Sequence, residues 1–191
     1  MKNLYLFGLA AVFMFAGALA AEEATQQIKS GPQEGDNIGP FYVTKLCGAE
    51  NDKVKEGQNL CYRCKNGSRP QVIVFTRSAD SKVAQLVKQL DKAVEENEDA
   101  DLRVFVNFMG EDKDDVVETA KKFAAKSKAK NVPFVLPNEF ENGPDNYGIN
   151  AKAEVTVVLA SDSSVKANYA VTSVKELDVE AVVKNLSKIL N

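Results

Sequence analysis

The chain contains no histidine, and only three of its 191 residues are cysteine. The lack of histidine excludes Cys–His and Ser–His nucleophile pairs, attachment of c-type haem, and every zinc or copper site that needs an imidazole ligand. Three cysteines are also too few for a Cys₄ metal site within one chain. We therefore expect neither a metal nor a cofactor.

The sequence also lacks a block of basic residues. Its 24 lysines and arginines are mixed with 27 acidic residues, which gives a formal net charge of −3. Proteins that bind nucleic acids typically concentrate their cations on one face or along one helix. We therefore expect no nucleic-acid partner.

The first 20 residues have the pattern of a secretory signal peptide. Lys2 precedes an apolar run over residues 4–15, and small residues lead to the sequence Ala18-Leu19-Ala20. This pattern predicts cleavage after Ala20 and export to the periplasm or the exterior, with an uncleaved membrane anchor as the alternative. After cleavage we expect no association with the membrane, and the oxidising compartment favours disulfide formation.

The rest of the chain has the length of one domain. Residues 21–35 are polar, contain glycine and proline and show no periodicity, which predicts a flexible leader. Residues 36–191 are expected to form a single α/β domain with an ordinary core.

Strands and helices alternate along this domain. The apolar run at residues 72–76 predicts a buried strand, and residues 81–96 have the spacing of an amphipathic helix. Together with a strand at 102–108 they predict a right-handed βαβ unit. The later patterns predict a helix beginning near Asp115, a short strand at 132–136, a hairpin of strands 155–160 and 165–171, and a final helix at 179–190.

This order of elements resembles the thioredoxin-like fold, from about Asp36 to the C-terminus. The sequence Gly35-Asp36-Asn37-Ile38-Gly39-Pro40-Phe41 is similar to the opening of peroxiredoxins and extracytoplasmic thioredoxin-like domains. Residues 131–136 look like the strand that those proteins insert before the hairpin. The resemblance implies an exported thioredoxin-like protein with a central mixed sheet, a βαβ unit, and a C-terminal hairpin and helix.

The chain departs from this family at its usual reactive site. The family places a reactive cysteine in the turn after the first central strand, but residues 76–81 contain no thiol. It also places a cis-proline before the hairpin, where this chain has Val155. Ordinary thioredoxin or peroxidase chemistry is therefore not expected there, and Arg77 and Val155 become candidates for a binding surface.

Two of the cysteines form the sequence Cys61-Tyr62-Arg63-Cys64 just before the first strong strand. The residues that follow, 65–70, include a glycine and a proline and predict a loop. We therefore expect no helix N-terminus to stabilise a thiolate at this pair. The groups in the sequence that would activate these thiols, by stabilising a thiolate, are the neighbouring cations Arg63 and Lys65.

Three disulfide pairings are possible, because Cys47 could join either member of the pair. A bond from Cys47 would stabilise the fold more, by about 3 kcal/mol against about 2 kcal/mol for the four-residue loop between Cys61 and Cys64. A four-residue loop also tends to carry strain, which is typical of labile or catalytic disulfides.

Two functions remain open. In the first, Cys61 and Cys64 exchange with protein thiols or disulfides of the cell envelope, so the protein is a thiol-disulfide oxidoreductase. Cys61 is then the nucleophile by analogy with other Cys-x-x-Cys proteins. In the second, the protein is a redox-inactive binding or scaffold protein of the cell envelope that uses Arg77 and Val155.

Overall fold

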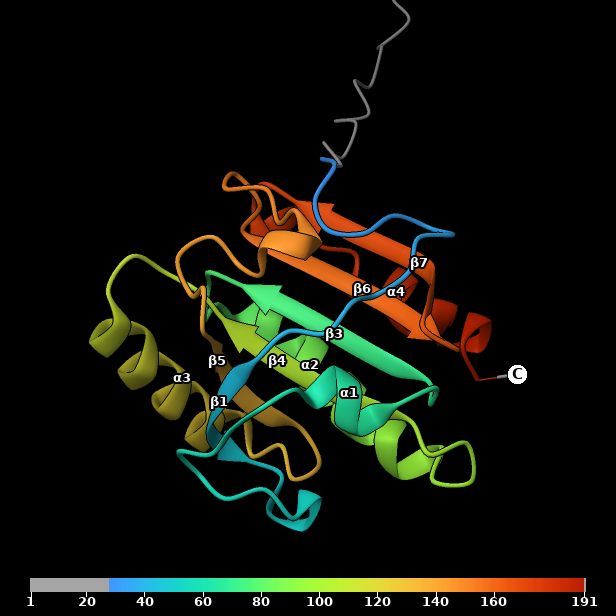
Figure 1. The fold of residues 1–191 in the computed structure, drawn as a ribbon, viewed down its shortest axis with the longest axis horizontal. Coiled ribbons are helices and arrows are strands. Elements are labelled where there is room, and N and C mark those ends of the chain that lie inside the picture. Colours follow the sequence, from blue (N-terminus) through green and yellow to red (C-terminus); the bar gives the residue numbers. More distant parts are fainter. Residues whose placement is uncertain (1–27, 191) are drawn as a thin grey trace, which may run out of the picture.

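The computed structural model describes residues 28–190, which form a mixed seven-stranded sheet (Figure 1). The strand order is β2-β1-β5-β4-β3-β6-β7. The strands are β1 (Val43–Gly48), β2 (Asn59–Leu60), β3 (Gln71–Thr76), β4 (Arg103–Phe108), β5 (Pro133–Pro137), β6 (Val155–Ser161) and β7 (Ser164–Val171).

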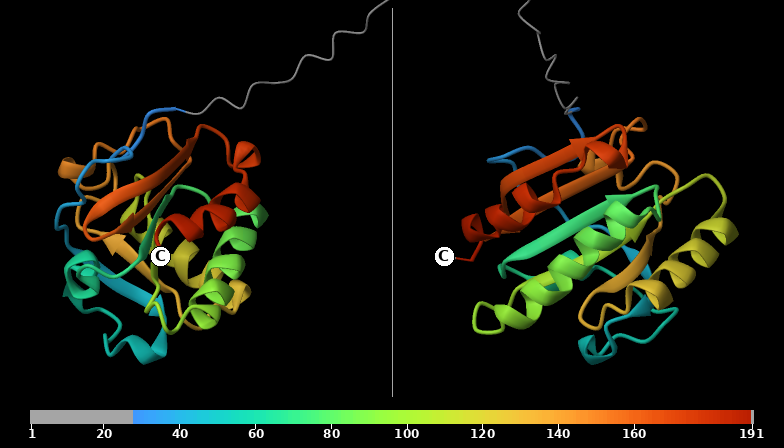
Figure 2. Two further views of the ribbon diagram at one scale, coloured as in Figure 1. Left: turned by 90° about the vertical axis from the view of Figure 1, so that its right-hand side faces the viewer. Right: turned by 180° about the vertical axis from the view of Figure 1, so that it is seen from behind.

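Helices cover both faces of the sheet, but unequally (Figure 2). One face is covered by α2 (Ser81–Glu96), α3 (Lys113–Ser127) and α4 (Val179–Lys184). The other face carries the short helix α1 (Tyr62–Asn66) and the segment that precedes β1. Short 3-10 helices are η1 (Glu50–Asp52), η2 (Asp145–Tyr147), η3 (Val174–Glu176) and η4 (Asn185–Lys188). Each face therefore has its own apolar cluster against the sheet.

The central elements confirm the α/β prediction. β3 and β4 are parallel neighbours connected by α2, which covers residues 81–96 as its periodicity predicts. Asp80 caps α2 by accepting a hydrogen bond from the backbone N–H of Lys82. β6 and β7 form the expected antiparallel hairpin next to β3. The buried β3 is thus paired on both sides, which agrees with its continuous apolar sequence.

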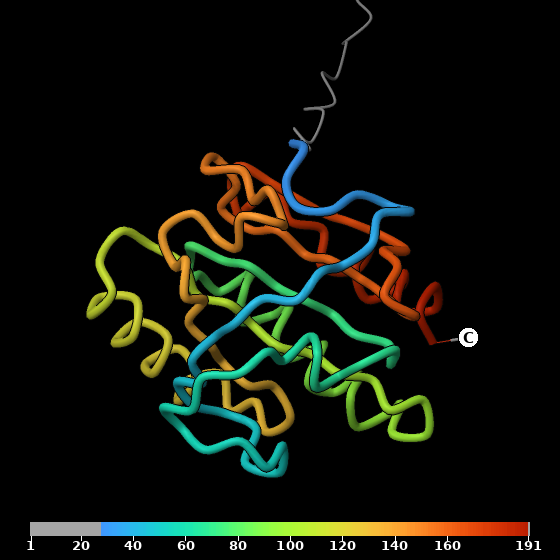
Figure 3. Tube along the Cα trace, viewed as in Figure 1, coloured from blue at the N-terminus to red at the C-terminus, as the bar shows by residue number. Residues whose placement is uncertain are grey.

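Residues 28–41 run across the sheet face that carries α1, passing β7, β6 and β3 on the way to β1 (Figure 3). Ser30 is buried, and its hydroxyl lies 2.7 Å from that of Thr156 in β6. The backbone N–H of Ile28 donates to the carbonyl of Ala170 in β7. The part of the predicted leader that the structure describes, residues 28–35, is therefore packed on the domain. The predicted signal peptide, residues 1–20, and residues 21–27 lie outside the described residues.

The prediction of a loop over residues 65–70 is wrong for residues 65 and 66, which belong to α1 (Tyr62–Asn66), and confirmed for residues 67–70, which lie between α1 and β3. Gly67 adopts a φ of +64° and ends the helix. Its backbone N–H donates to the carbonyls of Arg63 and Cys64. The glycine that suggested a loop is therefore the C-terminal cap of a helix of one and a half turns.

Candidate functional site

The structure joins Cys61 and Cys64 by a disulfide bond, with 5.2 Å between their Cα atoms. Cys61 is the N-cap residue of α1, and Cys64 lies within the helix. The two residues differ in exposure, since Cys61 is only 8% exposed and Cys64 is exposed. A molecule in solution therefore meets Cys64 first.

The helix start supplies a hydrogen bond to one sulfur. The backbone N–H of Cys64 donates to Sγ of Cys61 at 3.0 Å. This corrects the expectation that the pair receives no help from a helix N-terminus. When the disulfide is reduced, the same N–H is placed to stabilise a thiolate on Cys61.

Tyr62, between the two cysteines, anchors α1 on the sheet. Its side chain is 3% exposed, and its ring stacks on Phe105 of β4 with the centroids 5.6 Å apart. Its hydroxyl donates to the carboxylate of Asp52. Burial, the hydrogen bond to Asp52 and the charge of Asp52 raise the pKa of Tyr62. The tyrosine therefore stays protonated and acts as a hydrogen-bond donor.

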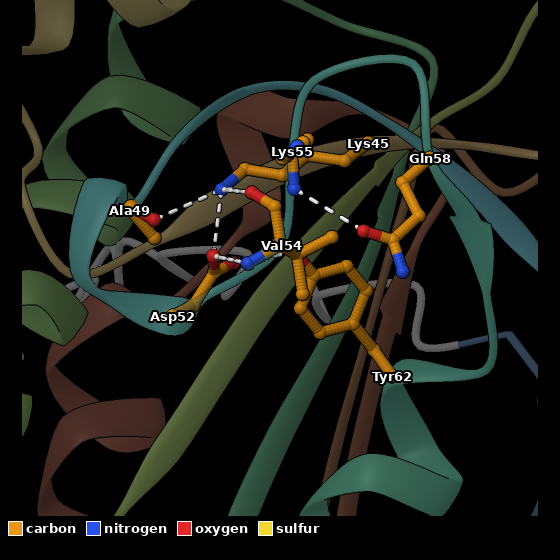
Figure 4. Close-up of polar contacts among 7 residues, drawn as sticks. All are labelled: Lys45, Ala49, Asp52, Val54, Lys55, Gln58 and Tyr62. Atoms are coloured by element: carbon orange, nitrogen blue, oxygen red, sulfur yellow. Dashed lines mark hydrogen bonds and ion pairs between the residues drawn. The ribbon is translucent and has the colours of Figure 1, made fainter.

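Asp52 in turn holds Lys45, a buried lysine of β1 (Figure 4). Nζ of Lys45 lies 2.8 Å from Oδ1 of Asp52 and donates to the carbonyls of Ala49 and Val54 at 2.9 Å each. An ammonium group has three protons, so all of its donors are satisfied without water. A chain of hydrogen bonds thus connects β1 to the helix that carries the disulfide.

The disulfide lies near the start of β3, away from the usual reactive position of the fold. The side-chain amide of Asn66, in α1, contacts that of Gln71, the first residue of β3. Thr76, at the other end of β3, is five residues further on, or about 17 Å along the strand. The sequence correctly places the cysteine pair ahead of β3.

The turn after β3 holds Arg77 in place of a cysteine. Nε of Arg77 is buried and has no hydrogen-bond partner among residues 28–190. Burial lowers the pKa of Arg77, and the charge of Glu111 acts in the opposite direction. Arg77 and Glu111 line a hollow of about 380 Å³, together with Phe108 and residues of α3. An acceptor group of a ligand could satisfy the free Nε–H from this hollow.

Val155 cannot take part in that surface. It is the first residue of β6, pairs with Thr76 and is 0% exposed. This corrects its expected binding role, because the residue belongs to the apolar core between the sheet and the helices.

Cys47 lies apart from the disulfide. Its thiol is free, and the residue packs against the apolar cluster on the face covered by α2 and α3. Tyr62 belongs to the cluster on the opposite face, so the sheet separates Cys47 from α1. Burial raises the pKa of the Cys47 thiol to about 11, and the charge of Glu56 acts in the same direction. Cys47 is therefore a weak nucleophile at neutral pH.

The part of the chain that the structure describes contains no cluster of three or more histidine, cysteine or acidic residues suited to a metal ion. In the same range, none of the helices has the length and apolar character needed to span a bilayer.

Sequence reasoning missed Asp52 and Lys45. A lysine in a strand is normally assigned to the solvated face, and nothing in the local pattern marks Lys45 as buried. Asp52 lies in a polar stretch without periodicity. The contact between them depends on how the segment after β1 folds back over the strand.

No protein-family model matches the chain, and neither does any curated protein sequence. Solved structures do match. The thioredoxin domain of a thiol-disulfide oxidoreductase from Bacteroides vulgatus superposes with a TM-score of 0.62 and 13% identity, over 84% of this chain and 99% of that one. A putative thiol:disulfide interchange protein DsbE from Chlorobium tepidum gives a TM-score of 0.59 and 15% identity, over 83% and 99% of the two chains. AhpC from Mycobacterium tuberculosis gives 0.59 and 16%, over 84% and 99%.

At these low sequence identities, the matches establish the fold of the chain, and its chemistry has to be argued from the residues of its own site. The matches extend over 83% and 84% of this chain, so they include most of the seven-stranded sheet and its helices. The chain therefore has the thioredoxin-like fold, with a Cys-x-x-Cys disulfide ahead of the central strand and no cysteine in the turn after it.

Proposed function

We propose that the protein exchanges disulfides with protein thiols through Cys61 and Cys64. The observation that carries this proposal is the asymmetry of the pair. Cys64 is exposed to an incoming thiol, whereas Cys61 is buried and accepts a hydrogen bond from the N–H of Cys64. The same hydrogen bond caps α1 in the oxidised protein, and after reduction it would stabilise a thiolate on Cys61.

The exchange begins at Cys64. A thiolate of the partner attacks Sγ of Cys64, the bond between the two sulfurs breaks, and its electron pair leaves on Cys61. The N–H of Cys64 stabilises the thiolate that Cys61 becomes. This assigns to Cys64 the contact with the partner that the sequence analysis gave to Cys61.

A second thiolate completes the reaction. It belongs to the partner and attacks the partner's own sulfur in the mixed disulfide, which releases Cys64 as a thiolate. Both thiolates of the protein then take up protons from water. The partner dithiol has lost two electrons to become a disulfide, and the Cys61–Cys64 disulfide has gained them as a dithiol.

We also propose that this exchange takes place in the periplasm or outside the cell. The support is the signal-like sequence of residues 1–20, which predicts export to an oxidising compartment. The partners would be thiol proteins or disulfide proteins of the cell envelope.

The reduction potential tests the proposal. Stabilising the reduced form makes a disulfide more oxidising. The Cys61/Cys64 couple should therefore equilibrate with glutathione or dithiothreitol at a potential less reducing than about −300 mV, the level below which structural disulfides typically lie. A Cys47→Ser variant serves as the background, so that the remaining thiol takes no part. A more reducing potential would refute exchange through this pair.

Trapping separates the roles of the two cysteines. With a disulfide-linked peptide as substrate, the Cys61→Ser variant should form a stable mixed disulfide at Cys64. In the same Cys47→Ser background, the Cys64→Ser variant should react about tenfold more slowly, because its remaining thiol, Cys61, is buried. Equal or reversed rates would show that Cys61, and not Cys64, reacts with the partner.

The unpartnered Nε of Arg77 favours a second candidate function, binding without redox chemistry. A ligand acceptor in the hollow beside Arg77 would pair the free donor. Under this alternative, Arg77→Ala should reduce capture of a specific protein from a cell-envelope extract, whereas Lys88→Ala on α2 should not. Unchanged capture by the Arg77 variant would reject this surface.

A further inference from the structure

A basic pocket of about 230 Å³ opens beside α1. Four of its lining residues are cations: Lys53, Lys65, Arg69 and Arg103. They come from three separate parts of the chain: the segment after η1, the region of α1, and the start of β4. The tertiary structure therefore gathers charges that the sequence disperses.

The positive charge of this pocket is only partly balanced. Asp52 is the one carboxylate among the lining residues, and it already binds the buried ammonium of Lys45. Arg69 and Arg103 share a single carboxylate, that of Asp101. Two exposed lysines add to this excess, Lys53 and Lys65. A protein with a net charge of −3 thus presents a local cationic site.

The basic pocket and the exposed cysteine lie on different sides of the same short helix, because Tyr62, Lys65 and Asn66 share the side that lines the pocket and Cys64 does not. Lys65 lines the pocket and directly follows Cys64 in the chain. Tyr62 and Asn66, which also line the pocket, belong to the same five-residue helix as Cys64. A helix with its side chains is about 10–12 Å across, and an extended chain covers about 3.3 Å per residue, so a peptide that passes the end of α1 can reach the pocket and the sulfur with residues three or four positions apart.

We infer that the basic pocket recognises an acidic residue a few positions from the partner's cysteine, by binding an aspartate or glutamate side chain. Guanidinium and ammonium groups bind carboxylates by charge-assisted hydrogen bonds, and the volume suits one such side chain. This inference rests on the proposed exchange at Cys64 and names its substrate class: thiols flanked by acidic residues. The pocket then orients the partner and speeds the encounter at low salt.

The experiment compares two reduced dithiol peptides. One carries aspartate and glutamate three and four positions from its cysteines, and the other carries asparagine and glutamine at the same positions. For each peptide, two rates are measured: its oxidation by the disulfide form of the protein, and its oxidation by the uncharged hydroxyethyl disulfide. The first rate is divided by the second, which removes differences in the thiol reactivity of the two peptides. At low ionic strength the acidic peptide should react about tenfold faster, and added salt should reduce this preference.

Two double variants test whether the basic pocket causes the preference for the acidic peptide. Lys53→Gln/Lys65→Gln should lower the ratio of acidic to neutral rates by about threefold, the size expected for loss of exposed charges. Lys88→Gln/Lys126→Gln makes the same change of net charge on α2 and α3, on the other face of the sheet, and should leave the ratio unchanged. All four lysines are exposed, so folding is preserved.

The outcomes separate the two claims. If both peptides react at equal normalised rates, or if the two double variants behave alike, the inference about the basic pocket is overturned while the exchange stands. If neither peptide reduces the disulfide, the proposed function fails, and the substrate class falls with it.

Discussion

Tyr62 and Asp52 connect the disulfide helix to the sheet: the tyrosine hydroxyl donates to Oδ2 of the aspartate, whose Oδ1 holds Lys45. Tyr62 sits between the two cysteines, so its position fixes both of them relative to β4 and β1. The buried side of α1 is therefore held by an aromatic contact and a charged hydrogen bond. Cys64 remains on the side that solvent reaches.

Removing the hydroxyl of Tyr62 should destabilise the protein. Hydrogen bonds to charged groups contribute about 1.5–3 kcal/mol, and Tyr62→Phe deletes one while keeping the ring stacked on Phe105. We expect a decrease of that size in the free energy of unfolding, measured with urea on the oxidised protein. Tyr42→Phe is the control, because Tyr42 is 56% exposed. Equal stability of the two variants would show that the contact with Asp52 contributes little.

Removing the charge of Asp52 should cost more. Asp52→Asn leaves the ammonium of Lys45, whose side chain is 3% exposed, without its counter-charge. Breaking one side of a buried ion pair typically costs about 3–5 kcal/mol, whereas replacing both partners costs less. Lys45→Met/Asp52→Asn should therefore be more stable than Asp52→Asn alone in urea unfolding. A double variant that is the less stable of the two would contradict a buried ion pair here.

The sequence predicts the central elements well because their patterns are long. The apolar spacing of α2 extends over 16 residues, and the four central residues of β3, residues 72–75, are all apolar. α1 has five residues, too few to show a helical period, and Gly67 is equally typical of a turn and of a helix end. The local sequence pattern therefore does not predict the helix at the cysteine pair.

The character of the candidate site depends on contacts between distant segments. The sequence identifies Cys61 and Cys64, but their difference in exposure follows from the way Tyr62 packs under α1. Likewise, Lys53 and Arg103 are 50 positions apart in the numbering and meet only in the fold. Such features need the tertiary structure, because no local spacing encodes them.

Cys47 should react slowly and become reactive only at high pH. In the oxidised protein it is the remaining thiol, and its folded pKa of about 11 lies above the unfolded value of about 8.5. At pH 8, iodoacetamide should modify the native protein more than about tenfold more slowly than the urea-unfolded protein with its disulfide intact. The difference should narrow as the pH approaches the folded pKa. A ratio near one at pH 8 would contradict the buried position.

The same shift predicts a loss of stability at alkaline pH. The folded state holds the Cys47 proton more tightly than the unfolded state. Its contribution to stability is therefore complete below the unfolded pKa and decreases as the pH rises toward the folded one. Urea unfolding between pH 8 and about 10.5 should show a smaller decline for Cys47→Ala than for the parent protein, after other alkaline effects common to both are subtracted. Parallel declines would rule out this linkage.

Ser30 provides a test of where the domain begins. Its hydroxyl oxygen lies 2.7 Å from that of Thr156 and accepts a hydrogen bond from the backbone N–H of Asn150 at 3.0 Å. Ser30→Ala removes both contacts and leaves polar groups unpaired beneath the segment, which should lower the free energy of unfolding by about 1–3 kcal/mol. Ser68→Ala, at an exposed position, should have no comparable effect.

A protein that starts at residue 36 should lose at least as much stability as Ser30→Ala, because it lacks the whole packed segment. If it were as stable as one that starts at residue 28, residues 28–35 would be a dispensable leader, and the contact between Ser30 and Thr156 would have no energetic importance.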